Sequence, residues 1–190
     1  TWEVRELHGF LWLNLIDRKN DGKSLQKIID IWILKYSKYK RSVWENSILS
    51  KRIISWILNV DIILNTGTFY FKKSFLNSII SQTNHLKKNI YFEKNYSKKL
   101  EIITALILSG LVFKEYIDNF NIGIKELEKL VKNYFDQDGF PLTRNPTDLI
   151  FFTKYLVLCK KCIKDAQQYA PEFLDIIIQK NFKCIKNILT

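Results

Sequence analysis

Two short stretches of this sequence place amide, imidazole and guanidinium groups where they could bind an anion. Asn84 and His85 are adjacent, and an amide donor beside an imidazole can hydrogen-bond a carboxylate and offset its charge. Arg144 follows the Asp138-Gly139 turn and precedes Pro146, a typical first residue of a helix. There the guanidinium, the backbone N–H groups and the helix dipole would all attract a carboxylate or a sulfate.

Each of these residues also has a structural explanation. Asn84 belongs to a polar series at helical spacing, as on a solvated helix face: Asn77, Ser81, Asn84 and Lys88. Arg144 stands four residues before Asp148 and could form an ion pair with it. Asn145 directly precedes Pro146, as an N-cap residue does, although its amide could also contact a ligand. Both interpretations stay open at each position.

Three tryptophans could stack on a sugar ring, because an aromatic face complements the apolar side of a pyranose. Trp32 and Trp56 lie on apolar helical stripes, so we expect both to be buried. Trp44 stands beside Arg41 and Glu45 and is expected to be the freest of the three. Trp44 is therefore the tryptophan that we consider for substrate binding.

Three other polar or ionisable side chains are expected to support the core. His8 lies among aromatic residues, which favours a packed core or interface histidine with a satisfied hydrogen bond. Arg52 stands four residues before Trp56 and is expected to form a cation–π contact or a buried ion pair. Tyr134 falls on an apolar helical stripe, which favours a core position.

Composition and charge narrow the class of protein. The 190 residues are 47% apolar, with six Gly and three Pro, which excludes a disordered or collagen-like chain. Thirty Lys and Arg against 19 Asp and Glu give a net charge of +11, which favours polyanionic partners. A biased base composition of the genome would explain the same lysine excess without any binding role. The longest nearly apolar run, 102–113, is too short for a membrane-spanning helix, which needs roughly 20 residues.

Motifs for metal or cofactor binding are missing from the sequence. The common nucleotide-binding, zinc-protease and serine-hydrolase motifs do not occur. Cys159 and Cys162 have the i, i+3 spacing of some zinc and redox sites, but no second paired motif accompanies them. We therefore expect core or surface thiols, no metal site and no cofactor.

A helical period recurs along the whole chain and predicts an all-α fold. The predicted helices cover 25–36, 53–64, 75–86, 97–113, 124–135, 146–163 and 171–189. Ser24 is a possible cap of the first helix, and 97–113 should be central because it is apolar on nearly all sides. The best strand candidate, 2–15, is mixed with polar residues, so we expect little or no sheet. About seven helices in antiparallel hairpins fit a bundle, an α-solenoid or an α/α toroid within one domain spanning 1–190.

Five segments, taken in order, resemble the N-terminal helical domain of heparinase II/III-like proteins, a polysaccharide-lyase-related family of bacteria. These segments are Leu7–Leu13, Arg52–Trp56, Gln82–Leu86, Ala105–Gly110 and Asp138-Gly139 leading to Arg144-Asn145-Pro146. The resemblance spans nearly the whole chain and implies an incomplete α/α toroid of antiparallel helix pairs, normally followed by a β-sandwich domain. Because the chain opens on Thr1 and contains no Met, we expect a fragment whose C-terminal β-sandwich is missing.

The resemblance further implies β-elimination on uronic-acid-containing acidic polysaccharides, in the bacterial periplasm or cell envelope. Asn84 and His85 match the family's Asn-His site, so both are candidate catalytic residues that neutralise the uronate. Arg144, Asn145 and Trp44 are then the candidate substrate-binding residues. The lyases carry a Tyr shortly after the Asp-Gly turn, where this chain has Phe140 and Pro141. Neither side chain can move a proton, so catalytic competence stays open, with Tyr134 one helical turn earlier as a possible substitute. Without the β-sandwich, we expect this fragment to be inactive alone.

A second function class stays open beside the lyase. The chain could be a non-catalytic helical scaffold that binds an acidic glycan, a protein or a nucleic acid. Nucleic acid is the least favoured partner, because lysines are spread along the chain and no nucleic-acid-binding motif is present. In the lyase interpretation Asn84, His85 and Arg144 converge on one concave, positively charged surface, whereas a scaffold would scatter them.

Overall fold

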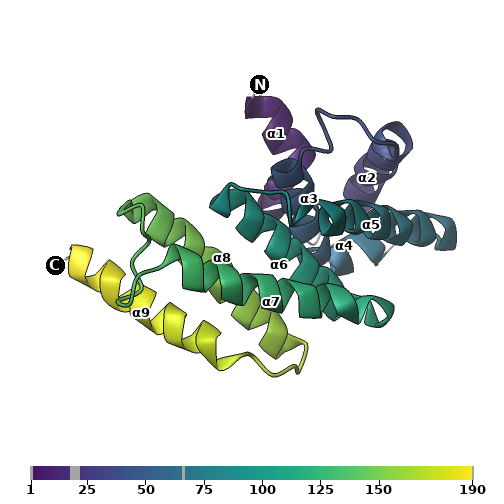
Figure 1. Cartoon of the computed structure of the whole chain (residues 1–190). Helices are drawn as coiled ribbons and strands as arrows, with labels where there is room; N and C mark the ends of the chain where they lie inside the picture. The colour runs from purple at the N-terminus through teal and green to yellow at the C-terminus, as the bar shows by residue number, and fades with distance from the viewer. Residues whose placement is uncertain (1, 18–21, 66, 190) are drawn as a thin grey trace. The chain divides into compact units, whose positions relative to one another are not determined.

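The computed structural model describes residues 2–17, 22–65 and 67–189 and is all-α within these ranges (Figure 1). The only β pairing among the described residues is an isolated bridge between Phe135 and Pro141. The segment 2–15, the best strand candidate in a chain expected to have little or no sheet, forms a helix and a short 3-10 helix. Phe10 separates the two with a left-handed backbone (φ 57°), which ends the α-helix.

The chain divides into two compact units, residues 1–91 (unit 1) and 92–190 (unit 2). The expected single domain, the toroidal order of the helix pairs and the β-sandwich partner stay predictions. No helix in the described ranges is long and apolar enough to cross a membrane.

Unit 1 is built around α3. Its elements are α1 (Trp2–Gly9), the 3-10 helix η1 (Leu11–Leu15), α2 (Gly22–Tyr36), α3 (Asn46–Leu58), α4 (Val60–Leu64) and α5 (Phe69–Asn89). Helix α3 packs against α1 and α5, and α2 packs against α4 and α5. The predicted helix 53–64 is two helices, since Asn59 interrupts it and its amide donates to the Ser55 carbonyl (2.8 Å). Ser24 is not a cap, because it lies inside α2.

An aromatic cluster forms the centre of unit 1. Trp56 is fully buried, and its ring lies edge-to-face on Trp32 (5.4 Å between centroids) and on Phe10 (5.3 Å). Phe75 of α5 contacts the same indole at 5.1 Å. These ring pairs join α2, α3 and α5 and bury Trp32 and Trp56, as the sequence predicted. Such pairs each contribute about 0.5–1.5 kcal/mol beyond their burial.

Unit 2 is a helical layer with α6 at its centre. Its elements are α6 (Tyr96–Val112), the 3-10 helix η2 (Lys114–Tyr116), α7 (Ile117–Tyr134), α8 (Pro146–Asp165) and α9 (Glu172–Leu189). Residues 100–110 are all buried, which confirms the central helix expected there. Helix α6 packs against α7 and α8, and α9 packs against α8 and α7 (Figure 1).

Glycine lets α6 and α7 approach closely. A Cβ on Gly123 would stand 2.6 Å from Ile107 Cγ1 and 3.2 Å from the Ile107 backbone nitrogen. Both distances are too short for carbon in van der Waals contact. The backbone of α7 therefore lies against α6 at a distance that only a residue without a side chain permits.

Candidate anion-binding site

A pocket in unit 1 brings together two of the residues singled out from the sequence. The cavity holds about 290 Å³ and lies where the segment before α3 meets the last turns of α5. Its lining residues are Tyr39, Arg41, Trp44, Glu45, Asn46, His85 and Asn89. Trp44 and His85 thus belong to one site. We call it the aromatic pocket.

Three rings form one wall of the aromatic pocket. Trp44 and His85 meet edge-to-face, with centroids 5.5 Å apart and planes at 85°. Tyr39 lies 5.6 Å from His85 and 6.2 Å from Trp44. The expected freedom of Trp44 is wrong, because its side chain is only 6% exposed and its indole N–H donates to the Tyr36 carbonyl (3.0 Å). Tyr39, 65% exposed, is the ring that solvent reaches.

The sequence did not indicate Tyr39 as a ligand-binding residue, because it stands among polar residues outside any periodic pattern. It belongs to the stretch Lys35-Tyr36-Ser37-Lys38-Tyr39-Lys40-Arg41, where polar residues leave no apolar period. Alternating aromatic and basic residues in a connection between two helices were the available sign of a binding surface. Asn46 and Asn89 carried no sign of their own, because single asparagines are common at helix ends.

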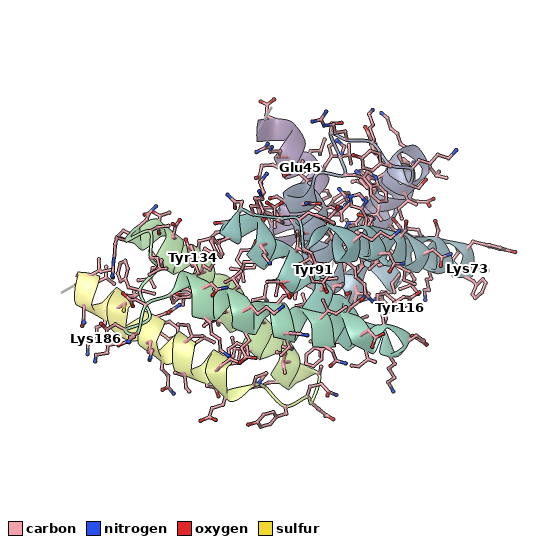
Figure 2. The ribbon with its side chains drawn as sticks, in the orientation of Figure 1. Glu45, Lys73, Tyr91, Tyr116, Tyr134 and Lys186 are labelled. Carbon is pink, nitrogen blue, oxygen red and sulfur yellow. The ribbon has the colours of Figure 1, made fainter. Side chains whose placement is uncertain are left out.

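Polar groups complete the aromatic pocket. Arg41 is exposed, and Glu45, labelled in Figure 2, caps α3 by accepting a hydrogen bond from the Ile48 backbone N–H (3.4 Å). Burial, and then the nearby charge of Lys88, lower the pKa of His85 below its usual 6.5. The imidazole is therefore neutral at pH 7 and carries one donor and one acceptor nitrogen.

Five exposed cations belong to the segments that form the aromatic pocket or lie close to them in sequence. We call them the basic cluster: Lys35, Lys38, Lys40, Arg41 and Lys88. Of these, Arg41 lines the pocket, and Lys88 lies near enough to His85 to lower its pKa. Lys35 and Lys40 both lie over the Tyr36 ring, 5.4 and 5.5 Å from its centroid. Within the described ranges, no Asp or Glu pairs with any of the five, whereas acidic residues of unit 2 pair with several lysines.

The net charge is concentrated in the unit that holds this pocket. Unit 1 has 15 Lys and Arg against 7 Asp and Glu, a formal charge of +8. Unit 2 has 15 against 12, a formal charge of +3. A biased base composition acts on the whole sequence, so it does not by itself explain a difference between the two units.

Asn84 does not line the aromatic pocket. It is exposed on α5, next to His85 in sequence but one position further round the helix. Arg144 and Asn145 belong to unit 2, so the predicted convergence of Asn84, His85 and Arg144 stays a prediction.

In unit 2, the Asp-Gly turn is held together by Asp136. One carboxylate oxygen accepts from the backbone N–H groups of Phe140 (2.8 Å) and Asp138 (3.0 Å), and the other pairs with Arg144 (2.6 Å). The hydrogen bond from Phe140 and the charge of Arg144 lower the pKa of Asp136. The ion pair of Arg144 with Asp148, one of the two alternatives left open by the sequence, is therefore wrong, because the partner is Asp136.

The neighbouring residues of this turn are structural. Asp148 accepts from the hydroxyls of Tyr134 (3.0 Å) and Thr143 (2.7 Å). Tyr134, labelled in Figure 2, is buried and stacks on Phe152 with centroids 4.2 Å apart, which confirms its core position. Asn145 caps α8 by accepting from the Thr147 N–H (2.9 Å), as the capping interpretation predicted.

His8 and the cysteines are also accounted for by packing. His8 is buried, and its Nδ1 accepts from the Trp32 indole N–H (2.9 Å), which confirms a satisfied core histidine. All three cysteines are free. Burial raises the pKa of Cys159 to about 12, so that thiol is unreactive. Among the described residues, no group of three His, Cys, Asp or Glu could hold a metal ion.

Comparison with known proteins adds no family assignment. No protein-family model, curated protein or solved structure matches this chain. The resemblance to heparinase II/III-like proteins therefore rests on the five sequence segments alone.

Proposed function

We propose that unit 1 binds an acidic saccharide in the aromatic pocket. One observation supports this most directly: an exposed tyrosine, a guanidinium and a neutral imidazole line one cavity of about 290 Å³. Ligand pockets occupy roughly 300–1,000 Å³, so the cavity suits a small unit such as one sugar residue of a longer chain.

Four of the lining groups have chemistry that suits a uronate or a sulfated sugar, whereas another polar group, the Glu45 carboxylate, accepts from the Ile48 backbone N–H as the cap of α3. The ring of Tyr39 offers an apolar face to a pyranose. Arg41 can bind a carboxylate or sulfate through two parallel N–H donors. Asn89 and the neutral imidazole of His85 supply donors and acceptors for hydroxyl groups. A ligand that combines an apolar ring face, hydroxyls and a negative charge matches this set.

The basic cluster favours a polymer over a single sugar. Its cations have no acidic partners in the described ranges, so a polyanion would release their counterions and would bind more weakly as salt rises. We propose on this basis that the ligand is an acidic polysaccharide and that the aromatic pocket holds one of its sugars.

The lyase function implied by the resemblance is part of the same proposal. In it, the chain is the helical substrate-binding domain of a heparinase II/III-like lyase, and Asn84 and His85 neutralise the uronate during β-elimination. In the lyases the β-sandwich domain supplies other reacting groups, so the proposal requires such a domain beside this chain. The absorbance of unsaturated uronic products, measured with a longer protein that includes such a domain, tests the reaction separately from binding.

A direct binding experiment tests the first part. The chain is titrated, at two salt concentrations, with oligogalacturonate, a heparin oligosaccharide, a neutral maltooligosaccharide and a single-stranded RNA of matched charge. We expect an acidic oligosaccharide to bind, and Arg41→Gln and Tyr39→Ala each to weaken it about tenfold, or 1.4 kcal/mol. Lys154→Gln, an exposed change in unit 2, is the matched charge control. The proposal is contradicted if Lys154→Gln lowers the affinity for the acidic oligosaccharide as much as the pocket variants do. It is also contradicted if the chain binds the RNA but neither of the acidic oligosaccharides.

A further inference from the structure

Arg52 is a buried cation that pairs with no carboxylate in the described part of the chain. The side chain extends from α3 and is 0% exposed, and no Asp or Glu of the described ranges pairs with it. Its guanidinium carbon lies 4.3 Å from the centroid of Trp32, so the ring partner expected from the sequence, Trp56, is wrong. Burial lowers the pKa of Arg52 to about 9, so the group is charged at pH 7.

Three hydrogen bonds take the place of a counter-ion. Nε donates to the amide oxygen of Gln82 (2.6 Å), and Nη1 donates to the carbonyls of His8 (2.9 Å) and Val43 (3.2 Å). Nη2 has no acceptor. A single side chain therefore ties α3 to α5, to the end of α1 and to the segment between α2 and α3.

Two of these bonds end beside the aromatic pocket. Val43 directly precedes Trp44, and Gln82 stands one helical turn before His85 on α5. The pocket is made of these two segments, the one before α3 and the last turns of α5. Arg52 is thus the hydrogen-bonding partner that both walls share, whereas the walls meet each other through ring contacts of Tyr39, Trp44 and His85.

Stability alone does not explain a cation at this position. Removing a guanidinium from water costs several kcal/mol, and an apolar residue of similar volume in a buried position is often neutral or stabilising. The cation–π contact and the carbonyl dipoles offset part of that cost. Unlike an apolar side chain, a guanidinium has directional N–H donors, and these fix the positions of the groups that accept from them.

We propose that Arg52 is the positioning residue of the aromatic pocket. By holding the Val43 carbonyl and the Gln82 amide at the same guanidinium, it sets the position of Trp44 relative to His85. The consequence for ligand affinity rests on the proposed function above, but the geometric statement does not. An alternative is that the ring contacts, with the hydrogen bond of Trp44 to Tyr36, hold the walls without Arg52.

The test uses the fact that the chain has only two histidines. The imidazole Cε1–H signals of His8 and His85 are followed by NMR in the whole chain, together with nuclear Overhauser effects between His85 and the ring of Trp44. Gln82→Leu removes the acceptor on α5, and Gln82→Glu keeps an acceptor in the same place. Arg52→Lys keeps the positive charge but replaces the several nitrogens of the guanidinium with the single nitrogen of an ammonium group.

We expect Gln82→Leu and Arg52→Lys to weaken the contact between His85 and Trp44 and to raise the pKa of His85 toward 6.5, since the ring becomes more solvated near Lys88, Arg41 and Glu45. Gln82→Glu should keep the contact between His85 and Trp44, and only this contact is compared for that variant, because the new charge itself raises the pKa of His85. Ile53→Ala, at a fully buried neighbour on α3, is the control for lost stability. The proposal is overturned if Gln82→Leu and Arg52→Lys leave the contact between His85 and Trp44 intact. It is also overturned if Ile53→Ala weakens this contact to the same extent at a temperature far below the melting temperature of that variant.

Ligand binding separates this inference from the proposed function. If the wild type binds an acidic oligosaccharide, Gln82→Leu should weaken it at least about tenfold and Gln82→Glu should not. If the wild type binds no acidic oligosaccharide while the NMR signals respond as expected, the proposed function fails and the positioning role stands. If the wild type binds an acidic oligosaccharide, and Gln82→Leu changes neither the NMR signals nor this binding, the positioning role fails and the proposed function stands.

Discussion

The imidazole of His85 stands edge-on to the indole of Trp44, with ring planes at 85° and centroids 5.5 Å apart. The two residues come from different segments and are 41 positions apart in sequence. Both rings line the aromatic pocket, in which Tyr39 is the exposed ring. Trp44 is consequently a wall that orients His85, whereas Tyr39 is the ring placed to meet a sugar.

His85→Ala should weaken saccharide binding and change stability little. His85 is half-buried, and its two ring contacts together contribute on the order of 1 kcal/mol, the low end of the range for aromatic pairs. We expect the melting temperature to fall by only a few degrees and the affinity for an acidic oligosaccharide to fall about tenfold. Thermal unfolding and a binding titration measure the two effects on one sample. A large loss of stability would mark His85 as a core residue.

Acid should destabilise unit 1 through His8. Burial, and then the charges of Arg52, Lys40 and Lys35, lower the pKa of His8 in the folded chain. The unfolded chain, with a pKa of about 6.5, therefore binds the proton more readily. The stabilising contribution is complete above about pH 6.5 and is lost as the pH falls through the folded value.

Urea unfolding at a series of pH values measures this loss, with His8→Gln as the comparison. The glutamine oxygen can accept from the Trp32 indole but does not take up a proton. We expect the pH dependence near pH 6 to shrink in His8→Gln. If it stays the same size, His85 or another group is responsible and the assignment to His8 is wrong.

Gly123→Ala should destabilise unit 2. The new methyl would stand 2.6 Å from Ile107 Cγ1, and overpacking of this kind costs about 1–3 kcal/mol. Gly22→Ala is the matched control, because its Cβ would meet nothing closer than 3.7 Å and alanine is the better helix former. Urea unfolding should show a loss for the first variant and none for the second. Equal effects would contradict the close packing of α6 and α7.

Asp136→Ala should cost more stability than Arg144→Ala. Asp136 accepts two backbone N–H groups of its turn besides the Arg144 guanidinium, and their loss costs about 1–2 kcal/mol. Arg144 is 67% exposed, and an exposed ion pair contributes about 0–1 kcal/mol. Because the pKa of Asp136 is lowered, its contribution is present above about pH 4 and is lost in stronger acid. Equal costs by urea unfolding at pH 7 would show that the ion pair dominates.

Periodicity predicted most of the helices because burial on one side of a helix leaves a 3.6-residue pattern. The helix expected at 146–163 begins at Pro146 behind the Asn145 cap, and the central helix expected at 97–113 is α6. Helix α1 was missed, since a short helix of mixed residues carries no clear period. The break at Asn59 was missed because apolar residues continue at helical spacing on both sides of it.

Residue types by themselves determined the helical class, the burial of Trp32, Trp56 and Tyr134, the cap at Asn145 and the excess of positive charge. Those properties follow from the local order of apolar and polar groups. Only the tertiary structure decided that Arg144 pairs with Asp136, that Arg52 lies on Trp32, and that Tyr39, Trp44 and His85 share one pocket. Such pairings depend on how separate helices meet, because side chains far apart in sequence become neighbours only when packing brings their backbones together.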